Sequence, residues 1–460
     1  MDTIAAISTP RGIPSGVGIL RISGERAIET AERVVRRPNG IALSDARERS
    51  MVRCALLDSS GAVMDDILAV VFRGPHSYTG EDVVELHCHG APVILEEALH
   101  VLFQVGARQA QPGEFTKRAF LNGRMDLTAA EAVIDLIDAE TAEAAHNAVG
   151  QLHGALARPI EKVYDALMAI ASRFYAVVDY PDEDIAPLQQ AEMEETLRRS
   201  ETLLRGLLAT AERGRVLKQG VLTAIVGRPN AGKSSLLNAL AGFDRAIVTD
   251  IPGTTRDTVE EKVRCGGVLL RLCDTAGIRS TDDAVEKIGV ERSLQALEQA
   301  ELVLAVLDGS VMPTEEDELL LTRVARHEKW ILVWSKADLR SELPVPYIIF
   351  TEEQHPPAAI VEVSSVTGAG LEALEQAVSD LFPTGTAAQG TVVTNARQAG
   401  AITRALDAVC ASRAALAQGM TPDAVLTDVE EALSALGELT GKTVREDLVA
   451  TIFSRFCVGK

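Results

Sequence analysis

Residues 227–234 read Gly-Arg-Pro-Asn-Ala-Gly-Lys-Ser, which is a complete G-x-x-x-x-G-K-S phosphate-binding loop. An apolar run, Val221–Val226, precedes the loop, and Ser235–Leu240 after it favours a helix. This is the strand–loop–helix context that the motif requires. Glycine-rich backbone at a helix N-terminus points N–H groups at negative charge. We therefore expect this part of the chain to be an α/β domain that binds a nucleoside triphosphate.

Two side chains of the phosphate-binding loop have expected roles of their own. Lys233 is expected to reach the β- and γ-phosphates, and the Ser234 hydroxyl is expected to ligate Mg²⁺. The other loop residues expected to contact the nucleotide are Asn230, Ala231, Gly232 and Ser235.

A second apolar run ends in an acid and a glycine. Leu269–Cys273 is followed by Asp274, Thr275, Ala276 and Gly277, so a strand delivers these groups to the same edge as the loop. Asp274 is suited to hold the water shell of the metal, and the Gly277 N–H to meet the γ-phosphate. The segment therefore predicts a switch that senses the nucleotide state.

Two later strands predict which base is bound. Trp330–Trp334 leads into Ser-Lys-Ala-Asp at 335–338, and Ile360–Val363 leads into a pair of serines. The Asp338 carboxylate can accept both N–H donors on the Watson–Crick edge of guanine, and adenine lacks that pair. A backbone N–H of the serine pair is placed to meet the guanine O6. These motifs predict GTP, with base contacts from Ser335, Lys336, Ala337, Asp338, Ser364 and Ser365.

The residues near the phosphates also indicate how GTP is hydrolysed. Many GTPases place a water-orienting glutamine after the Asp-x-x-Gly motif, but here the position is Ile278, which cannot orient water. Residues 246–257 look like the first switch, in which Thr255 suits a second Mg²⁺ ligand. Oxygens of this switch and of Asn230 can form a cage for a monovalent cation, which would do the electrostatic work of an arginine finger. Alternatively, Asn230 only caps the loop. The cation cage would comprise Asn230, Thr249, Ile251 and Thr254. The switch residues expected to contact the nucleotide are Thr249, Asp250, Ile251, Pro252, Gly253, Thr254 and Thr255.

Together these motifs and several other blocks resemble the bacterial tRNA modification GTPase family MnmE (TrmE), over the whole chain. The GTPase motifs alone fit several translation-associated GTPases, whereas the N-terminal blocks and the Cys-x-Gly-Lys end are specific to this family. The blocks that carry the resemblance are 18–24, 78–86, 112–115, 118–123, 227–235, 249–257 and 457–460.

The resemblance implies further site residues. The acid that orients water falls on Glu286, within Val-Glu-Lys-Ile-Gly at 285–289, and the caged cation is potassium. The N-terminal domain is expected to bind a 5-formyl- or 5,10-methylene-tetrahydrofolate, through Arg21, Glu85, Arg124 and the terminal Lys460. Arginine at position 124 departs from the lysine found in family members and changes the hydrogen-bond geometry. Without the family, Arg21 is equally consistent with a solvated charge after a strand.

The resemblance also implies the reaction and its partners. With the flavoprotein MnmG (GidA), in a heterotetramer built on a homodimer, the family adds a carboxymethylaminomethyl or aminomethyl group to C5 of the wobble uridine of tRNA. Cys457 is then a candidate nucleophile in one-carbon transfer. Alternatively, Cys457 has no chemical role and is only a small residue in the C-terminal tail. A rival hypothesis is a regulatory GTPase of ribosome assembly without one-carbon chemistry. Ser335 departs from the asparagine usual in Asn-Lys-x-Asp, which predicts weaker binding of guanine nucleotides by about 1 kcal/mol.

Composition places the chain among cytoplasmic enzymes. The 460 residues are 47% hydrophobic and suffice for about three domains, and no membrane span or basic leader is evident. The formal net charge of −21 argues against nucleic-acid binding through a broad basic face, so a partner is expected to supply tRNA-binding surface. Six cysteines without C-x-x-C spacing indicate a reduced compartment. Residues 87–89, His-Cys-His, look like a metal fragment, but strand alternation turns Cys88 away from the two histidines.

Pattern shifts along the chain predict a multidomain protein. We expect an α+β domain at 1–120, helical segments at 121–218 and 383–460, and an α/β G domain at 219–382. The resemblance implies that the α+β domain is a folate-binding and dimerisation domain and that the G domain is Ras-like. Thr128 with Glu131 forms a capping-box pattern that predicts a helix start. The two helical segments suggest one bundle into which the G domain is inserted.

Overall fold

The chain folds into two compact units, each built from stretches that are far apart in the sequence. The computed structural model describes residues 2–179, 189–243, 261–273, 297–339, 354–383, 390–443, 446–454 and 456–459. The first unit comprises Met1–Ile134, Leu152–Leu197 and Ala408–Lys460, and the second comprises Asp135–Gln151 and Arg198–Asp407.

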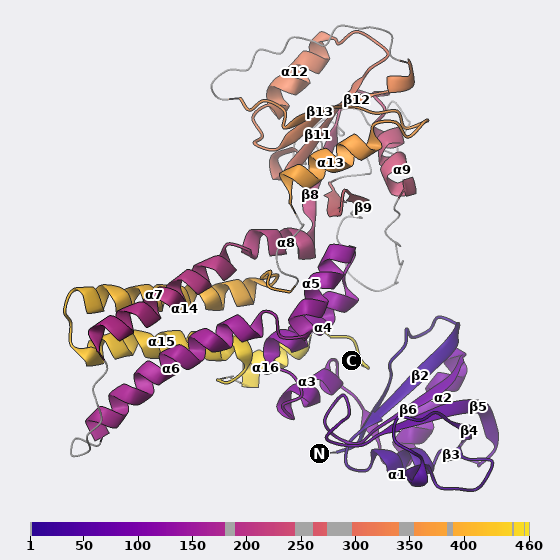
Figure 1. Cartoon of the computed structure of the whole chain (residues 1–460). Helices are drawn as coiled ribbons and strands as arrows, with labels where there is room; N and C mark the ends of the chain where they lie inside the picture. Colours follow the sequence, from indigo (N-terminus) through magenta and orange to yellow (C-terminus); the bar gives the residue numbers. More distant parts are fainter. Residues whose placement is uncertain are drawn as a thin grey trace. The chain divides into compact units, whose positions relative to one another are not determined.

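A seven-stranded sheet forms the N-terminal part of the first unit (Figure 1). Its order is β3-β4-β5-β6-β2-β1-β7, and all neighbours are antiparallel except β1 and β7. Alternating residues of β6 face opposite ways, so that Leu86 and Cys88 are buried in the core while His89 is exposed. The strands are β1 (Ile4–Ile7), β2 (Ser15–Ser23), β3 (Val35–Arg36), β4 (Val52–Leu57), β5 (Val63–Phe72), β6 (Val83–Gly90) and β7 (Arg108–Gln109).

Helices cover this sheet differently on its two faces. On one face, α1 (Ala27–Glu32) and α2 (Pro92–Gln104) bury a large apolar core with the strands. Near β1, a smaller apolar cluster forms around Phe115 of α3 (Glu114–Leu121), with Val458 of the C-terminal tail packed against it. The tail therefore belongs to the N-terminal sheet, although it lies at the far end of the sequence.

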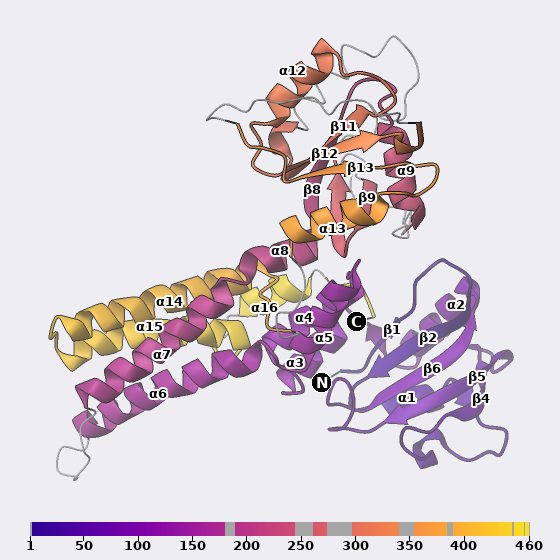
Figure 2. The ribbon, with the colours of Figure 1, turned by 45° about the horizontal axis from the view of Figure 1, so that its top comes forward.

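A six-stranded sheet forms the core of the second unit (Figure 2). Its order is β13-β12-β11-β8-β10-β9, and every pair is parallel except β9 with β10. The four apolar runs that predicted strands around the nucleotide motifs are β8, β10, β12 and β13. The strands are β8 (Val221–Val226), β9 (Glu261–Cys265), β10 (Val268–Leu272), β11 (Leu302–Asp308), β12 (Trp330–Ser335) and β13 (Ala359–Glu362).

Helices cover both faces of this sheet, as expected for a mostly parallel sheet. On one face, α9 (Lys233–Phe243) and α13 (Leu371–Leu381) bury their apolar side chains against the strands. On the other face, α12 (Glu315–Val324) packs against β11 and β12. Burial on both faces explains why β8, β11 and β12 each read as a continuous apolar run, whereas the edge strands β9 and β13 keep partly exposed residues.

The remaining helices include a group that lies side by side in Figures 1 and 2, namely α6, α7, α14 and α15. Helix α6 packs against α15, and Tyr175 of α6 donates a hydrogen bond to Glu430 of α15. Arg413 of α14 forms an ion pair of 2.6 Å with Glu194 of α7. Helices from before and after the six-stranded sheet thus contact one another. The helices are α4 (Leu127–Ile137), α5 (Ala142–Leu152), α6 (Ala157–Asp179), α7 (Gln190–Leu208), α8 (Ala211–Gln219), α14 (Ala396–Ala417), α15 (Pro422–Thr440) and α16 (Glu446–Phe453).

One predicted helix start was wrong. Helix α4 begins at Leu127, so Thr128 lies inside the helix rather than at its cap. The Asp126 carboxylate accepts the Ala129 N–H at 2.9 Å and the Thr128 hydroxyl at 2.6 Å. An aspartate two residues earlier caps the helix, because its carboxylate accepts the free N–H of the first turn.

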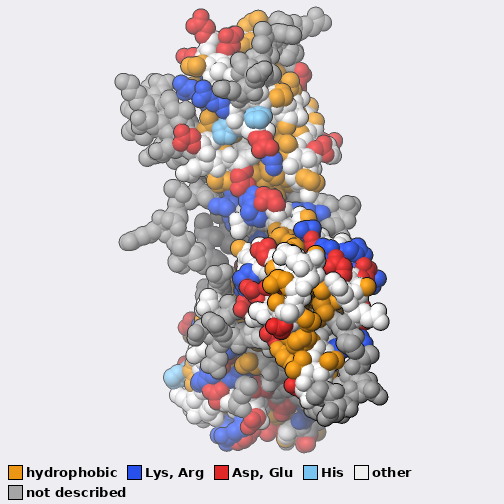
Figure 3. Space-filling view, turned by 90° about the vertical axis from the view of Figure 1, so that its left-hand side faces the viewer, with side chains coloured by type: hydrophobic (Ala, Val, Ile, Leu, Met, Phe, Trp, Pro, Cys, Tyr) orange, Lys and Arg blue, Asp and Glu red, His pale blue; other side chains and the backbone are white. Residues whose placement is uncertain are grey.

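The surface over the helical segments is mixed in character. In Figure 3, hydrophobic side chains gather near the middle of the face, and basic and acidic side chains lie around them. Among the described helices, none is both long and apolar enough to cross a lipid bilayer.

Candidate functional site

The phosphate-binding loop is a tight curl between β8 and α9. Asn230 and Gly232 both adopt positive φ values, of 60° and 95°. A Cβ at Gly227 would lie 2.3 Å from the Val306 carbonyl oxygen of β11, so only glycine fits there. Helix α9 begins at Lys233, so its free N–H groups lie where the loop ends. The segment has the geometry of an anion-binding site.

Lys233 lies beneath this curl and is held by the loop itself. Its Nζ donates to the Gly227 carbonyl at 2.8 Å and to the Arg228 carbonyl at 2.7 Å. Burial lowers the pKa of Lys233, because desolvation disfavours the charged ammonium. A phosphate bound in the loop would place a negative charge beside this ammonium and favour its charged form.

The first half of the loop is fastened to the N-terminus of α12. Asp317 is buried and accepts a hydrogen bond of 2.6 Å from Arg228 Nε. The same carboxylate accepts the Thr314 N–H at 2.9 Å, which caps the helix. One buried acid thus caps a helix and positions the phosphate-binding loop.

The end of β12 brings together the residues predicted to bind the base. Lys336 has a φ of 54° and forms an ion pair of 2.5 Å with Asp308. Burial raises the pKa of Asp308, but the bonds from Lys336 and Ser310 outweigh it and lower the pKa. Asp338 is exposed and accepts a hydrogen bond of 2.6 Å from the Ser364 hydroxyl, which orients its carboxylate at the sheet edge.

The loop and the β12 end are in direct contact. The Ser335 hydroxyl lies 2.5 Å from the Ala231 carbonyl oxygen of the loop. A Cβ on Gly232 would lie 3.0 Å from the same hydroxyl. The structure therefore assembles the loop, Ser335–Asp338 and the Ser364–Ser365 pair at one edge of the sheet. Other predicted residues lie outside the described residues, namely Thr249, Asp250, Ile251, Pro252, Gly253, Thr254, Thr255, Asp274, Thr275, Ala276, Gly277, Ile278 and Glu286.

The predicted folate residues lie in the first unit. Arg21 of β2 and Glu85 of β6 are direct register partners across two antiparallel strands. Arg21 Nε donates to Glu85 Oε1 at 2.9 Å, and the guanidinium lies over the rings of Tyr78 and Phe115, at 5.4 and 5.7 Å from their centroids. Arg21 is thus a partly buried, oriented cation and not a solvated one.

His87 adds a second polar group beside this pair. Its Nε2 is buried, lies 3.5 Å from Glu85 Oε2, and has no hydrogen-bond partner among the described residues. Arg124 donates from Nε to the Ser77 carbonyl at 3.1 Å. Within the described residues, no group of three or more His, Cys, Asp or Glu side chains is arranged to hold a metal. His89 instead bonds to Asp65 at 2.6 Å.

The C-terminal tail is held next to the Arg21–Glu85 pair. Val458 forms an antiparallel bridge with Pro112, and the Ser8 hydroxyl donates to the Gly459 carbonyl at 3.1 Å. The Val458 side chain joins the cluster around Phe115, the residue on which Arg21 stacks. Cys457 directly precedes these contacts and is exposed, and Lys460 lies outside the described residues.

Comparisons with known proteins decide the family. The profile of the MnmE helical domain matches residues 127–457, and the profile of the GTP-binding protein TrmE N-terminus matches residues 3–124. The tRNA modification GTPase MnmE of Alkaliphilus oremlandii is 41% identical over all of this chain and 99% of its own length. The chain belongs to the MnmE family.

Other relatives and one solved structure complete these comparisons. The MnmE proteins of Geobacillus kaustophilus and Lacticaseibacillus paracasei are 43% and 44% identical, over all of this chain and 99% and 98% of their own lengths. A structure of Aquifex aeolicus Era bound to GDP and AlF₄⁻ is 23% identical and covers 40% of this chain and 65% of its own. Its TM-score of 0.23 is too low to support a conclusion.

Sequence reasoning missed several residues that shape the two sites of this MnmE chain. Arg118 is buried and binds Glu81, Asp2 and Glu114 at 2.7–3.0 Å. Arg118 lies in the block 118–123 that carried the family resemblance. A charged residue in such a short segment is ordinarily expected to be exposed, so the sequence did not indicate that Arg118 is buried. Asp317 was missed because its partner Arg228 lies 89 residues away. The His-Cys-His run could have singled out His87 only if the neighbouring strand had been known.

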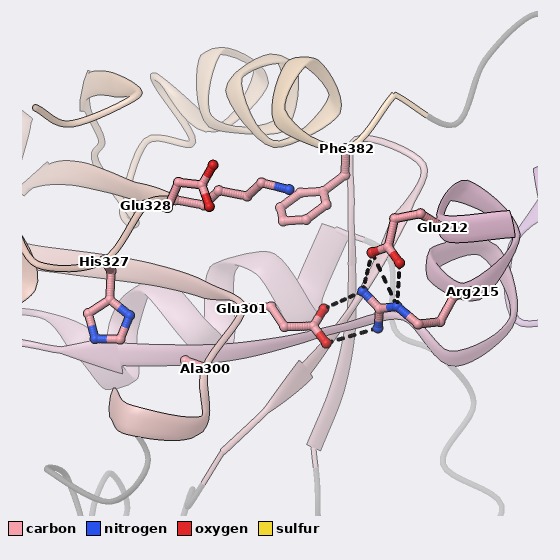
Figure 4. A pocket seen from close by; sticks show the side chains of 8 residues that line it. Glu212, Arg215, Ala300, Glu301, His327, Glu328 and Phe382 are labelled. Atoms are coloured by element: carbon pink, nitrogen blue, oxygen red, sulfur yellow. Dashed lines mark hydrogen bonds and ion pairs between the residues drawn. The ribbon is translucent and has the colours of Figure 1, made fainter. Parts of the chain in front are cut away.

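A cavity of about 260 Å³ at the other edge of the G-domain sheet is separate from the nucleotide motifs (Figure 4). It is lined by Glu301 and Lys329, which directly precede β11 and β12, so it lies at the amino ends of the parallel strands. Arg215 of α8 binds Glu301 at 2.8 and 2.9 Å and Glu212 at 2.7 Å. These ion pairs fasten the helix that enters the domain.

Proposed function

We propose that this chain is a potassium-activated GTPase that modifies the wobble uridine of tRNA together with the flavoprotein MnmG. The product carries a carboxymethylaminomethyl or aminomethyl group at C5, and a tetrahydrofolate derivative supplies the one-carbon unit. Membership of the MnmE family over the full length supports this reading. The observation that carries the GTPase part is Lys233, which lies beneath the curled loop at the N-terminus of α9.

At the nucleotide edge, we assign the phosphates to the loop and to Lys233, and the guanine to Asp338 with the backbone of Ser364 and Ser365. Mg²⁺ would be held by Ser234 and Thr255. Potassium would be held by Asn230, Thr249, Ile251 and Thr254, and Glu286 would orient the attacking water. The carboxylate orientation of Asp338 supports the base assignment, because Ser364 holds it at the sheet edge.

At the N-terminal sheet, we assign the folate to Arg21, Glu85, Arg124 and Lys460. An oriented guanidinium suits a carboxylate or a ring oxygen, and a carboxylate suits the N–H donors of a pterin. The bound folate would supply an activated one-carbon unit. Cys457, exposed on a tail that is fixed to β1 and to the Pro112 turn, would be the nucleophile.

The test of this proposal separates its two chemistries. Purified protein should bind 5-formyltetrahydrofolate and hydrolyse GTP faster in potassium than in sodium. Glu286→Ala should cut GTP turnover by roughly 10²-fold with little change in GTP affinity. Cys457→Ser should leave turnover within about a factor of two, because the tail belongs to the other site, and should abolish modification of the wobble uridine in cells.

Three results would contradict parts of the proposal. No binding of 5-formyltetrahydrofolate would favour a regulatory GTPase instead. Equal turnover in sodium and potassium would remove the cation from the mechanism. Normal modification by Cys457→Ser would make the thiol structural.

A further inference from the structure

The side chain of Ser335 is fully engaged with the main chain of its own domain. Its hydroxyl lies 2.5 Å from the Ala231 carbonyl oxygen and 3.1 Å from the Leu307 carbonyl oxygen. Ser335 is only 4% exposed. The Gly232 Cα lies so close above it that a Cβ there would approach the hydroxyl to 3.0 Å.

Hydrogen-bond chemistry limits what this hydroxyl can do for a base. A serine hydroxyl has one hydrogen to donate, and both neighbouring groups are acceptors. That hydrogen is therefore directed to the protein, to Ala231 of the phosphate-binding loop or to Leu307 of β11. Guanine N7 is also an acceptor, so it needs a donor that Ser335 cannot provide without breaking its bond to the main chain.

We propose that this chain recognises guanine without reading N7, and that Ser335 acts as a positioning residue that holds the phosphate-binding loop. The inference rests on the proposed GTP site, in which Asp338 binds the Watson–Crick edge. Specificity then comes from that edge and from O6. An N7 that is left to water costs no more than roughly fivefold in affinity, the value of one hydrogen bond, because the bond to water is kept when the base is bound.

An asparagine at this position has different chemistry. Its amide carries two N–H donors and one acceptor, so it can bond to a main-chain carbonyl and to N7 at the same time. Ser335→Asn should therefore restore an N7 contact, whereas Ser335→Ala removes the bond to the loop and adds no donor. The two variants separate the reading of N7 from the support of the loop.

The test compares GDP with 7-deaza-GDP, in which a C–H replaces N7, by equilibrium binding to the full-length chain. The wild-type protein should bind the two within about twofold. Ser335→Asn should prefer GDP by roughly fivefold, the value of one hydrogen bond of about 1 kcal/mol. Ser335→Ala should weaken both nucleotides by a similar factor of roughly five and keep their ratio near that of the wild type.

Comparison between variants removes the other effects of the deaza substitution. The change also alters the ring electronics, but it does so equally in all three proteins, so only a change in the ratio reports on position 335. A wild-type preference for GDP over 7-deaza-GDP that falls about fivefold in Ser335→Ala would overturn the inference, because Ser335 would then be reading N7. Identical ratios in the wild type and Ser335→Asn would show that this position does not face N7. Equal affinity of all three proteins for GDP and ADP would instead overturn the GTP site on which the inference rests.

Discussion

The two sheets of this protein present their functional residues in opposite ways. In the six-stranded sheet, the described candidate residues lie at or just after the carboxyl ends of parallel strands, in the phosphate-binding loop, the first turn of α9 and the end of β12. In the seven-stranded sheet, Arg21 and Glu85 lie in the middle of strands and meet across an antiparallel register. The first arrangement uses main-chain N–H groups and a curled loop, whereas the second uses side chains on a fixed surface.

This difference decides how each site depends on the rest of the fold. A phosphate-binding loop is a contiguous segment, so its conformation follows largely from its own glycines and from the helix that it opens. The Arg21–Glu85 pair needs two strands in the correct register, together with aromatic rings from two other segments. Changes in packing should therefore damage the N-terminal site more than the nucleotide site.

Loss of Arg118 should give the largest effect. Arg118→Met leaves the carboxylates of Glu81 and Glu114 without their shared buried cation, so the free energy of unfolding should fall by about 3–5 kcal/mol. Urea unfolding, followed by far-UV circular dichroism, would measure this free energy of unfolding. The matched control is Arg26→Met, which removes an exposed ion pair with Glu29 and should cost less than about 1 kcal/mol. Equal losses in the two variants would show that burial does not decide the effect.

Removal of Lys233 from the phosphate-binding loop should give the next largest effect. This effect should be confined to nucleotide binding at the six-stranded sheet. Lys233→Ala should weaken GTP binding by about 2–3 kcal/mol, because a charge-assisted bond to phosphate is lost. Titration calorimetry would measure the affinity. Lys162→Ala, an exposed lysine on α6, serves as the control and should change nothing. Unaltered GTP affinity in Lys233→Ala would place the phosphates elsewhere.

Neutralising Glu85 should give a smaller, local effect on the N-terminal site. Glu85→Gln removes the charge that orients Arg21, so binding of 5-formyltetrahydrofolate should weaken by about 1–2 kcal/mol. Binding of GTP should stay the same, because this residue belongs to the other unit. Both affinities can be measured on one preparation. A parallel loss of GTP affinity would contradict the independence of the two sites.

The smallest effect concerns His89 on the exposed end of β6. Hydrogen bonding to Asp65, followed by its charge, raises the pKa of His89 above its ordinary value of 6.5. The stabilisation from this pair is therefore fully present below about pH 6.5 and is lost as the pH rises through the raised pKa. In an NMR titration, Asp65→Asn should return the pKa of His89 to near 6.5. A pKa that does not move would show that Asp65 does not hold the imidazolium.

Local sequence was sufficient for the phosphate-binding loop and for the strands around it, because these segments are contiguous. The apolar runs around residues 221, 269, 330 and 360 predicted β8, β10, β12 and β13. Burial on both faces makes β8 and β12 unbroken apolar segments, whereas the edge strand β13 leaves Ile360 exposed. The phosphate-binding loop followed from its own residues, because glycines and a helix N-terminus suffice to make it bind anions. The start of α4 was misplaced because Thr128 fits a capping-box pattern, whereas the folded chain uses Asp126, two residues earlier, to accept the Ala129 N–H.

Only the tertiary structure decided which distant groups meet. Arg21 and Glu85 are 64 residues apart and are joined by strand register, which hydrophobic periodicity does not specify across a sheet. The C-terminal tail reaches Ser8 across 451 residues, and no local pattern indicates that contact. The sequence showed that position 335 is serine where asparagine is usual. The folded chain alone decided that its hydroxyl is directed to the main chain, because a donor with one hydrogen bonds to whatever acceptor the packing brings nearest.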